Sequence, residues 1–259
     1  MTSRIHPSAL VHPGARLAAD VEVGPYSVIG GEAEIGEGSW IGAHVVIDGR
    51  VRIGRRNRVF HFASVGAPPQ DKKYKGEPTG VEIGDDNVIR EYVTINRGTA
   101  QDIGVTRIGN ENWIMAYVHF AHDCQVGNKT IFANCTQLAG HVVVEDWVIF
   151  GATTLVHQFV RIGAHAFTGM GSFISQDVPP YVLAAGHMAS PYGINSEGLK
   201  RRGFAPQTIQ AIKRAYRTLY RSGLSLEEAK TQLEAQAQSC PEIKPILDFL
   251  ASSKRGIAR

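Results

Sequence analysis

Four polar side chains in the middle of the chain, His119, His122, His141 and Gln158, are the residues best suited to chemistry. Imidazole is the commonest zinc ligand in proteins, and in its neutral form it is also the commonest general base. Asp123 directly follows His122, so its carboxylate could orient the ring and stabilise the imidazolium formed on protonation. A lone histidine is more often structural, so a functional role depends on whether these side chains converge.

A six-residue repeat shows how they could converge. Ile, Val or Leu occupies every sixth position from Ile5 to Val65. The repeat resumes at Ile83 and then runs from Ile108 to Ile174, where Thr168 is the one polar repeat position. Neither the helical period of about 3.6 residues nor simple alternation reproduces this pattern. A fixed short period is typical of a solenoid, in which each hexapeptide forms a short strand and a turn with its aliphatic residue inward.

The same period predicts the fold and places the candidate residues within it. Three strands make a triangular coil of about eighteen residues, so residues eighteen apart should stack on successive coils at about 4.8 Å. We therefore expect a mainly β protein built as a parallel β-helix. His122, His141 and Gln158 follow, by two or three places, repeat residues that are eighteen apart. These side chains should therefore share one corner of the solenoid, about 5 Å apart per coil.

The repeat is interrupted in two places. Between Val65 and Val81 the sixfold phase continues, but the segment APPQDKKYKGEPTG is too rich in Pro, Gly and Lys to form a buried coil edge. Between Ile95 and Ile108 the interval is thirteen residues instead of six. We expect protruding loops near 68–80 and 98–106. Insertions of this kind often build the binding face of a solenoid, although decorative loops would give the same pattern.

After the last repeat the tail has helical character. Apolar residues from Ile209 to Tyr220 follow helical spacing, Ser225 begins a capping box for a second helix, and a third short helix is expected from Ile243 to Leu250. We predict a β-helix domain at 1–190 and a small α-helical C-terminal domain at 191–259. The second domain would cap the open end of the solenoid.

Charge and composition narrow the function further. The net charge is +3, but the tail from residue 197 onward carries twelve Lys or Arg against six Asp or Glu, which leaves −3 on the remainder. A basic tail suggests an anionic partner, although a solvated helical surface has the same composition. Three cysteines are too few for a disulfide framework. No signal peptide, long apolar segment or aromatic-interleaved basic stretch is found, so we expect a cytoplasmic protein with no stable membrane insertion and no nucleic-acid partner.

Four motifs indicate a family: HFAHDC at 119–124, LAGH at 138–141, VHQF at 156–159 and NSEGLKRRGF at 195–204. With them the sequence resembles the acyl-carrier-protein-dependent UDP-N-acetylglucosamine O-acyltransferases, which begin lipid A biosynthesis in Gram-negative bacteria. The resemblance covers essentially the full length, including the QDKKYKGEP loop and the RGT segment at 97–99. It implies a left-handed coil and a homotrimer with three active sites between subunits. It implies no cofactor, because the acyl donor is carried on the phosphopantetheine of acyl carrier protein.

The resemblance also implies a catalytic role for three residues. His122 matches the general base that removes the proton from the glucosamine 3-hydroxyl of UDP-N-acetylglucosamine. Asp123 matches the carboxylate that orients this base, and Gly140 matches the oxyanion-hole N–H. His119, His141 and Gln158 match groups that position the substrate.

Further substrate contacts are implied outside the histidine motifs. Asp71 and Lys73, on the first loop, match residues that reach the neighbouring subunit's site, with Asp71 at the sugar and Lys73 near the donor or a phosphate. The tail residues that match contacts to donor and nucleotide are Asn195, Glu197, Arg201 and Arg202. Arg202 is the best candidate for a phosphate, because a guanidinium can bind it through two parallel hydrogen bonds. Acyl carrier proteins are acidic, which would give the basic tail its partner.

One position departs from the relatives that select long acyl chains. They have Gly where this sequence has Met170, in FTGMGS. A Met side chain in the acyl groove would shorten it by several methylenes, each of which contributes about 0.8 kcal/mol when buried. We therefore expect a preference for a 3-hydroxyacyl chain shorter than C14, about ten to twelve carbons, unless Met170 only packs the coil.

Other functions remain to be weighed. A zinc site like that of the β-helix carbonic anhydrases fits poorly, because the His119, His122 and His141 spacing lacks their histidine pair about five residues apart; we expect no metal. The N-acyltransferase that acts later in the same pathway carries an extra N-terminal domain, whereas the repeats here start at Ile5. An acetyl-CoA-dependent acetyltransferase would have no use for a long acyl groove. A scaffold solenoid would not need a converging His/Gln corner.

Overall fold

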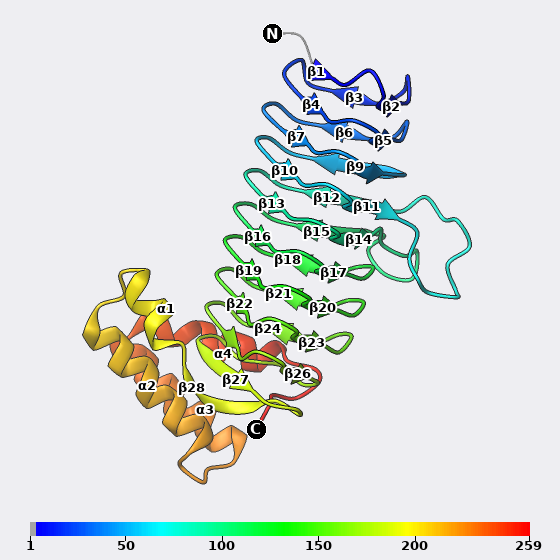
Figure 1. Ribbon diagram of the computed structural model, residues 1–259. Helices are drawn as coiled ribbons and strands as arrows, with labels where there is room; N and C mark the ends of the chain where they lie inside the picture. The colour runs from blue at the N-terminus through cyan, green and yellow to red at the C-terminus, as the bar shows by residue number, and fades with distance from the viewer. Residues whose placement is uncertain (1–3) are drawn as a thin grey trace.

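The computed structural model describes residues 4–259, which form a triangular prism of short strands with a group of helices at one end (Figure 1). The chain passes in turn through three sheets, and successive coils add one strand to each. We call them the first, second and third sheets in the order in which the chain enters them. The parallel β-helix expected from the repeat is confirmed.

The three sheets have eleven, nine and eight strands. The first sheet contains β1 (Arg4–Ile5), β4 (Glu22–Val23), β7 (Trp40–Ile41), β10 (Arg58–Val59), β13 (Val88–Ile89), β16 (Trp113–Ile114), β19 (Ile131–Phe132), β22 (Ile149–Phe150), β25 (Phe167–Thr168), β27 (Val182–Ala185) and β28 (Ser190–Ile194). The second contains β2 (Leu10–Val11), β5 (Val28–Ile29), β8 (Val46–Ile47), β11 (Ser64–Ala67), β14 (Thr94–Asn96), β17 (His119–Phe120), β20 (Gln137–Leu138), β23 (Leu155–Val156) and β26 (Phe173–Ile174). The third contains β3 (Arg16–Leu17), β6 (Glu34–Ile35), β9 (Arg50–Ile53), β12 (Gly80–Ile83), β15 (Val105–Ile108), β18 (Gln125–Val126), β21 (Val143–Val144) and β24 (Arg161–Ile162).

The register of the strands follows the sequence period. In uninterrupted coils each strand pairs in parallel with the strand eighteen residues later, as His119 pairs with Gln137 and Gln137 with Leu155. The repeat residues point into the prism, where side chains such as Ile41 and Phe120 are fully buried. Burial of each such side chain contributes about 1.5–3 kcal/mol, so the repeat itself supplies the core. Thr168 is also fully buried, and its hydroxyl hydrogen-bonds that of Thr154 at 3.0 Å.

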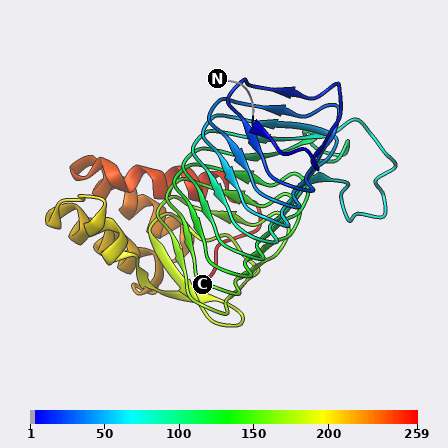
Figure 2. The same cartoon turned by 45° about the horizontal axis from the view of Figure 1, so that its top comes forward.

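Both interruptions of the repeat become loops that leave the second sheet. Residues 68–79 connect β11 to β12, and residues 97–104 connect β14 to β15. Figures 1 and 2 show the longer loop extending away from the prism. The two expected protrusions are therefore present, and both start at the same corner of the coil.

The tail closes the C-terminal end of the prism. Its helices are α1 (Ser196–Arg201), α2 (Pro206–Tyr220), α3 (Leu226–Ser239), the 3-10 turn η1 (Pro241–Ile243) and α4 (Lys244–Ser252). The three helices expected from the sequence correspond to α2, α3 and α4, and the Ser225 capping box is formed. The short helix α1 was not expected, and β28 spans the boundary expected at residue 190. Within residues 4–259, none of these helices has the length and apolar character needed to span a bilayer.

Candidate functional site

One corner of the prism gathers most of the candidate residues. We call it the second-sheet corner: the turns and loops that follow β11, β14, β17, β20 and β23. A cleft of about 970 Å³ opens there. Its lining includes Asp71, Lys73, Asp102, His122, His141 and Gln158. The convergence predicted from the eighteen-residue spacing is therefore observed.

The turns of this corner stack in register. His122, Gly140 and Gln158 occupy the first turn position on three successive coils. The second turn position has a left-handed backbone, with φ of 61° at Asp123, 63° at His141 and 64° at Phe159. The offset of one place between His122 and His141 in the sequence thus separates two columns of side chains, one for each turn position.

Gly140 has a structural reason to lack a side chain. A Cβ at this position would lie 2.5 Å from Cε1 and 2.8 Å from Nε2 of His122, closer than carbon atoms can approach. The Gly140 N–H donates no hydrogen bond to any of residues 4–259. Other coils have Pro7, Pro13 and Pro25 at the same turn position, so the fold does not use this N–H. Among these residues it is therefore left without an acceptor.

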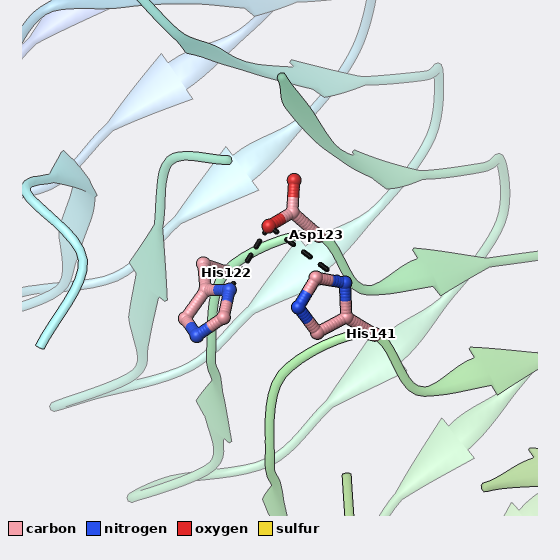
Figure 3. A group of neighbouring side chains, drawn as sticks. All are labelled: His122, Asp123 and His141. Carbon is pink, nitrogen blue, oxygen red and sulfur yellow. Dashed lines mark hydrogen bonds and ion pairs between the residues drawn. The ribbon is translucent and has the colours of Figure 1, made fainter. Parts of the chain in front are cut away.

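His122 and Asp123 form a hydrogen-bonded pair. Nδ1 of His122 lies 2.9 Å from Oδ2 of Asp123. Since a carboxylate only accepts, the ring donates from Nδ1 and keeps its lone pair on Nε2. Figure 3 shows His122 and His141 on two sides of the same carboxylate. A carboxylate that accepts from one nitrogen of an imidazole, and leaves a lone pair on the other, can orient a general base.

The Asp123 carboxylate is buried and fully engaged. Its side chain is inaccessible to solvent, and it accepts hydrogen bonds from the Thr99 N–H at 3.0 Å and the Thr99 hydroxyl at 2.7 Å. Burial pushes the pKa of this carboxyl upward, but the hydrogen bonds from His122 and Thr99 outweigh it, and the pKa is lowered. Asp123 is therefore an anion that can stabilise an imidazolium at His122.

His141 has a different carboxylate partner. Its Nδ1 lies 2.6 Å from Oδ2 of Asp102 and 3.9 Å from Oδ2 of Asp123. The ring stacks on Phe159, with centroids 4.4 Å apart and planes at 11°, and stands perpendicular to His122. These contacts fix the ring on three sides.

His119 lies on β17 beside this corner. Its Nδ1 is 2.7 Å from the Thr94 hydroxyl. Burial, with a smaller contribution from the nearby His122, lowers the pKa of His119, so the ring is neutral at pH 7. A neutral His119 can position a substrate without adding charge.

Comparison with known proteins bears on what this geometry serves. Residues 177–258 match the family model described as UDP-N-acetylglucosamine O-acyltransferase, domain 2, and residues 106–140 match bacterial transferase hexapeptide repeats. A relative from Thiobacillus denitrificans, named acyl-[acyl-carrier-protein]–UDP-N-acetylglucosamine O-acyltransferase, is 60% identical over 98% of this chain and 99% of its own. The chain belongs to this O-acyltransferase family.

Solved structures of the family have the same fold. LpxA from Acinetobacter baumannii superposes with a TM-score of 0.96 at 45% identity, covering 98% of this chain and 99% of that one. The UDP-N-acetylglucosamine acyltransferase of Francisella novicida gives 0.97 at 43% identity, covering 98% and 94%. The family resemblance inferred from the motifs is thus confirmed.

The first loop brings two implied contacts of the family to the cleft. Asp71 and Lys73 line it together with His122 of the same chain. Oδ1 of Asp71 accepts the Lys73 N–H at 2.9 Å, which closes a tight turn in the loop. Their implied reach to a neighbouring subunit stays a prediction.

The tail residues lie at another corner, where the chain leaves the third sheet. Asn195 caps α1 and donates to the carbonyl of His165 at 3.0 Å. Arg202 donates to the carbonyl of Trp147 at 2.7 Å and lies 2.9 Å from Nδ1 of His165. Burial lowers the Arg202 pKa, although a guanidinium stays charged. These bonds occupy part of its donor set.

The other two tail candidates, and the predicted acyl-length determinant, face solvent. Glu197 pairs with Lys200 at 2.7 Å, and Arg201 is exposed. Met170 occupies a turn after β25, at the corner that follows the first sheet, and is 79% exposed. A single chain therefore does not bring the tail residues or Met170 to the second-sheet corner.

Sequence reasoning missed the part of the site supplied by residues 97–104. Thr99 and Asp102, from this loop, and Phe159 were not singled out. The RGT motif pointed to Thr99, but it gave no indication that its hydroxyl reaches Asp123. Among the described residues, His122, Asp123 and His141 are the one group close enough to hold a metal, with ligand atoms within 4.8 Å. The Asp123 carboxylate of this group is buried and already accepts hydrogen bonds from His122 and Thr99, which disfavours that use.

Proposed function

We propose that this chain transfers a 3-hydroxyacyl group from acyl carrier protein to the glucosamine 3-hydroxyl of UDP-N-acetylglucosamine, the first step of lipid A biosynthesis. The observation that carries this proposal is that His122, which lines an open cleft, is paired with the buried Asp123 at 2.9 Å and lies against Gly140, whose N–H has no acceptor among residues 4–259. The names of the curated relatives, 53–60% identical to this chain, support the reaction.

His122 is the general base of the proposed reaction. Its Nε2 takes the proton of the sugar 3-hydroxyl while the hydroxyl oxygen attacks the thioester carbonyl carbon. The new C–O bond forms, and the carbonyl electrons move to oxygen. When this tetrahedral intermediate collapses, the C–S bond breaks and the leaving thiolate takes the proton back from His122. The products are the ester and the free thiol of acyl carrier protein, so the step needs no oxidant and no cofactor of the protein's own.

Two neighbours stabilise the charges of this step. Asp123, an anion because of its hydrogen bonds, stabilises the imidazolium formed at His122. The free Gly140 N–H donates to the oxyanion, and an oxyanion-hole donor contributes about 2.7–4 kcal/mol to barrier lowering in other acyl-transfer enzymes. His119, His141, Gln158, Asp71 and Lys73 hold the sugar and the donor.

We further infer a homotrimer with the left-handed coil implied by the family resemblance. Asn195, Glu197, Arg201 and Arg202 would reach the nucleotide or donor from another subunit, because they lie at a different corner from His122 in one chain. The basic tail would attract acyl carrier protein. The Arg201 side chain has no hydrogen bond or ion pair to residues 4–259, so it is freer than Arg202 to bind a phosphate.

We infer that Met170 restricts the acyl chain to fewer than fourteen carbons. Its exposure of 79% in one chain fits a side chain that meets the acyl group of a site formed with a second copy. Activity against 3-hydroxyacyl carrier proteins of graded length tests this, and Met170→Gly should shift the optimum to longer chains. An optimum at fourteen carbons in the wild type would contradict it.

The proposed function is tested by acyl transfer to UDP-N-acetylglucosamine, with products identified by mass. We expect transfer by the wild type and near-complete loss of transfer in His122→Ala. The control is His12→Ala, which should keep full activity. It removes an exposed histidine that follows the same sheet but lies at least three strands away from the strands at the cleft. Far-UV circular dichroism and sedimentation establish that the variants keep fold and assembly. Absence of transfer at every chain length would refute the proposal. Activity retained in His122→Ala would refute the assignment of the base.

A further inference from the structure

The cleft holds two separate carboxylate–imidazole pairs. His122 donates from Nδ1 to Asp123 at 2.9 Å, and His141 donates from Nδ1 to Asp102 at 2.6 Å. The cross distance, from Nδ1 of His141 to Oδ2 of Asp123, is 3.9 Å, too long for a hydrogen bond. Each imidazole therefore has its own acceptor.

We propose that Asp102 is a positioning residue that fixes the tautomer and orientation of His141. Through this contact, Nδ1 of His141 carries the proton and Nε2 offers its lone pair to a hydroxyl or amide N–H of the sugar substrate. The inference rests on the proposed function and adds to it a residue that acts through His141.

The chemistry of the two partners supports this assignment. A neutral imidazole has one N–H, and a carboxylate accepts but does not donate, so the Asp102 contact requires the proton on Nδ1. Nε2 of His141 has no hydrogen bond to any residue in the range 4–259, which leaves it for a ligand in the cleft. The Phe159 stack at 4.4 Å fixes the plane of the ring, while Asp102 fixes its rotation within that plane.

Asp102 also keeps Asp123 available to His122. Without Asp102, the nearest carboxylate to His141 is Asp123, which already accepts from His122 and from Thr99. A His141 that turned toward Asp123 would compete with the general base for its acceptor. The loop at 97–104 therefore serves both pairs, since it supplies Thr99 to Asp123 and Asp102 to His141.

The experiment compares Asp102→Ala with Asp102→Asn and with the control Ile103→Ala, a neighbouring loop residue that is 53% exposed. Two readouts are measured: kcat and KM for UDP-N-acetylglucosamine, and the His141 tautomer from two-bond ¹H–¹⁵N correlations of the imidazole ring. The Asn side chain has an oxygen that can accept from Nδ1–H, whereas Ala has none. The tautomer readout needs no activity, so it stays informative even if the proposed reaction is wrong.

We expect a lone pair on Nε2 of His141 in the wild type and in Asp102→Asn, and a proton on Nε2 in Asp102→Ala. We expect kcat/KM to fall about tenfold in Asp102→Ala, with most of it restored in Asp102→Asn and none lost in Ile103→Ala. An unchanged tautomer in Asp102→Ala would overturn the proposal. A second result would also overturn it: Asp102→Asn keeps the wild-type tautomer of His141 but loses as much kcat/KM as Asp102→Ala. The loss of activity would then come from the missing charge of Asp102 and not from the tautomer of His141.

Discussion

Gly140 offers a sharp test, because its substitution by Ala disturbs His122, the proposed general base, without removing any proposed catalytic group. The added Cβ would lie 2.5 Å from Cε1 of His122, whereas carbon atoms pack at about 3.5–4.0 Å. The ring must therefore retreat by about 1 Å or rotate. A misplacement of this size costs about 10²-fold in rate, or about 2.7 kcal/mol in the activation free energy. We expect kcat to fall about 100-fold in Gly140→Ala.

The fold should tolerate this change. The backbone at Gly140 has no left-handed φ, so Ala adds no backbone strain. The same turn position already holds alanine in other coils, at Ala43, Ala116 and Ala152. The backbone N–H also remains, so the proposed oxyanion donor is kept and the loss of activity would report on the His122 ring alone.

A matched control exists at the same corner. Gly31 occupies the first turn position after β5, and a Cβ there would lie 2.6 Å from Nδ1 of His12. Gly31→Ala thus crowds a histidine in the same way but far from the cleft, and we expect its kcat to equal that of the wild type. Steady-state acyl transfer measures both variants. A Gly140→Ala enzyme that keeps its fold and loses less than about threefold in kcat would refute either the ring contact or the role of His122.

Three further predictions follow from the hydrogen bonds and pKa shifts. Thr99→Ala should destabilise the protein by about 1.5–3 kcal/mol at pH 7, because the buried Asp123 carboxylate loses a donor. The lowered pKa of Asp123 stabilises the fold above pH 3.8, the ordinary value, and this stabilisation is lost as pH falls through the lower folded value. In urea unfolding, the difference in free energy of unfolding between wild type and Thr99→Ala should therefore narrow below pH 3.8. A difference that stays constant with pH would contradict this. Burial, with the charge of Arg202, lowers the pKa of His165 to about 4. Between pH 6.5 and about 4 the unfolded chain therefore binds a proton at His165 that the folded chain excludes. The free energy of unfolding should decrease as the pH is lowered through this range. His165→Asn should flatten this decrease, and an unchanged slope would contradict it. EDTA should leave acyl transfer unchanged, since the buried Asp123 carboxylate already accepts hydrogen bonds from His122 and Thr99; loss of activity that zinc restores would contradict this.

The fold could be predicted because its information is local and repeated. Each hexapeptide carries its own inward aliphatic residue, and the period alone fixes which residues stack on successive coils. The same arithmetic predicted that His122, His141 and Gln158 share a corner, and the structure confirms it. It also separated His122 from His141 by one turn position, which is the offset that lets their rings lie perpendicular with centroids 5.0 Å apart.

The contacts of the loops could not be predicted in this way. Asp102 meets His141 across 39 residues of sequence, and Thr99 meets Asp123 across 24. Both belong to a loop of irregular length, to which no period applies, so their partners depend on how the loop folds back. The tail shows the same limit. Helical spacing predicted α2, α3 and α4, but nothing local indicated that Arg202 would reach back to Trp147.

The distribution of the candidate residues over three corners has a structural consequence. The proposed acid–base pair, His122 and Asp123, follows the second sheet. The tail residues contact turns that follow the third sheet, and Met170 follows the first. The sheets of a packed prism separate these corners, and the core between them is filled by fully buried side chains such as Phe120 and Phe132. No movement of a rigid coil can bring Met170 or Arg202 to His122 within one chain. Copies packed side by side can, because the corner of one prism then faces a different corner of its neighbour. The catalytic assignment therefore requires an assembly, which the proposed homotrimer would supply: if His122, Met170 and the tail act on one substrate, more than one chain must build each site.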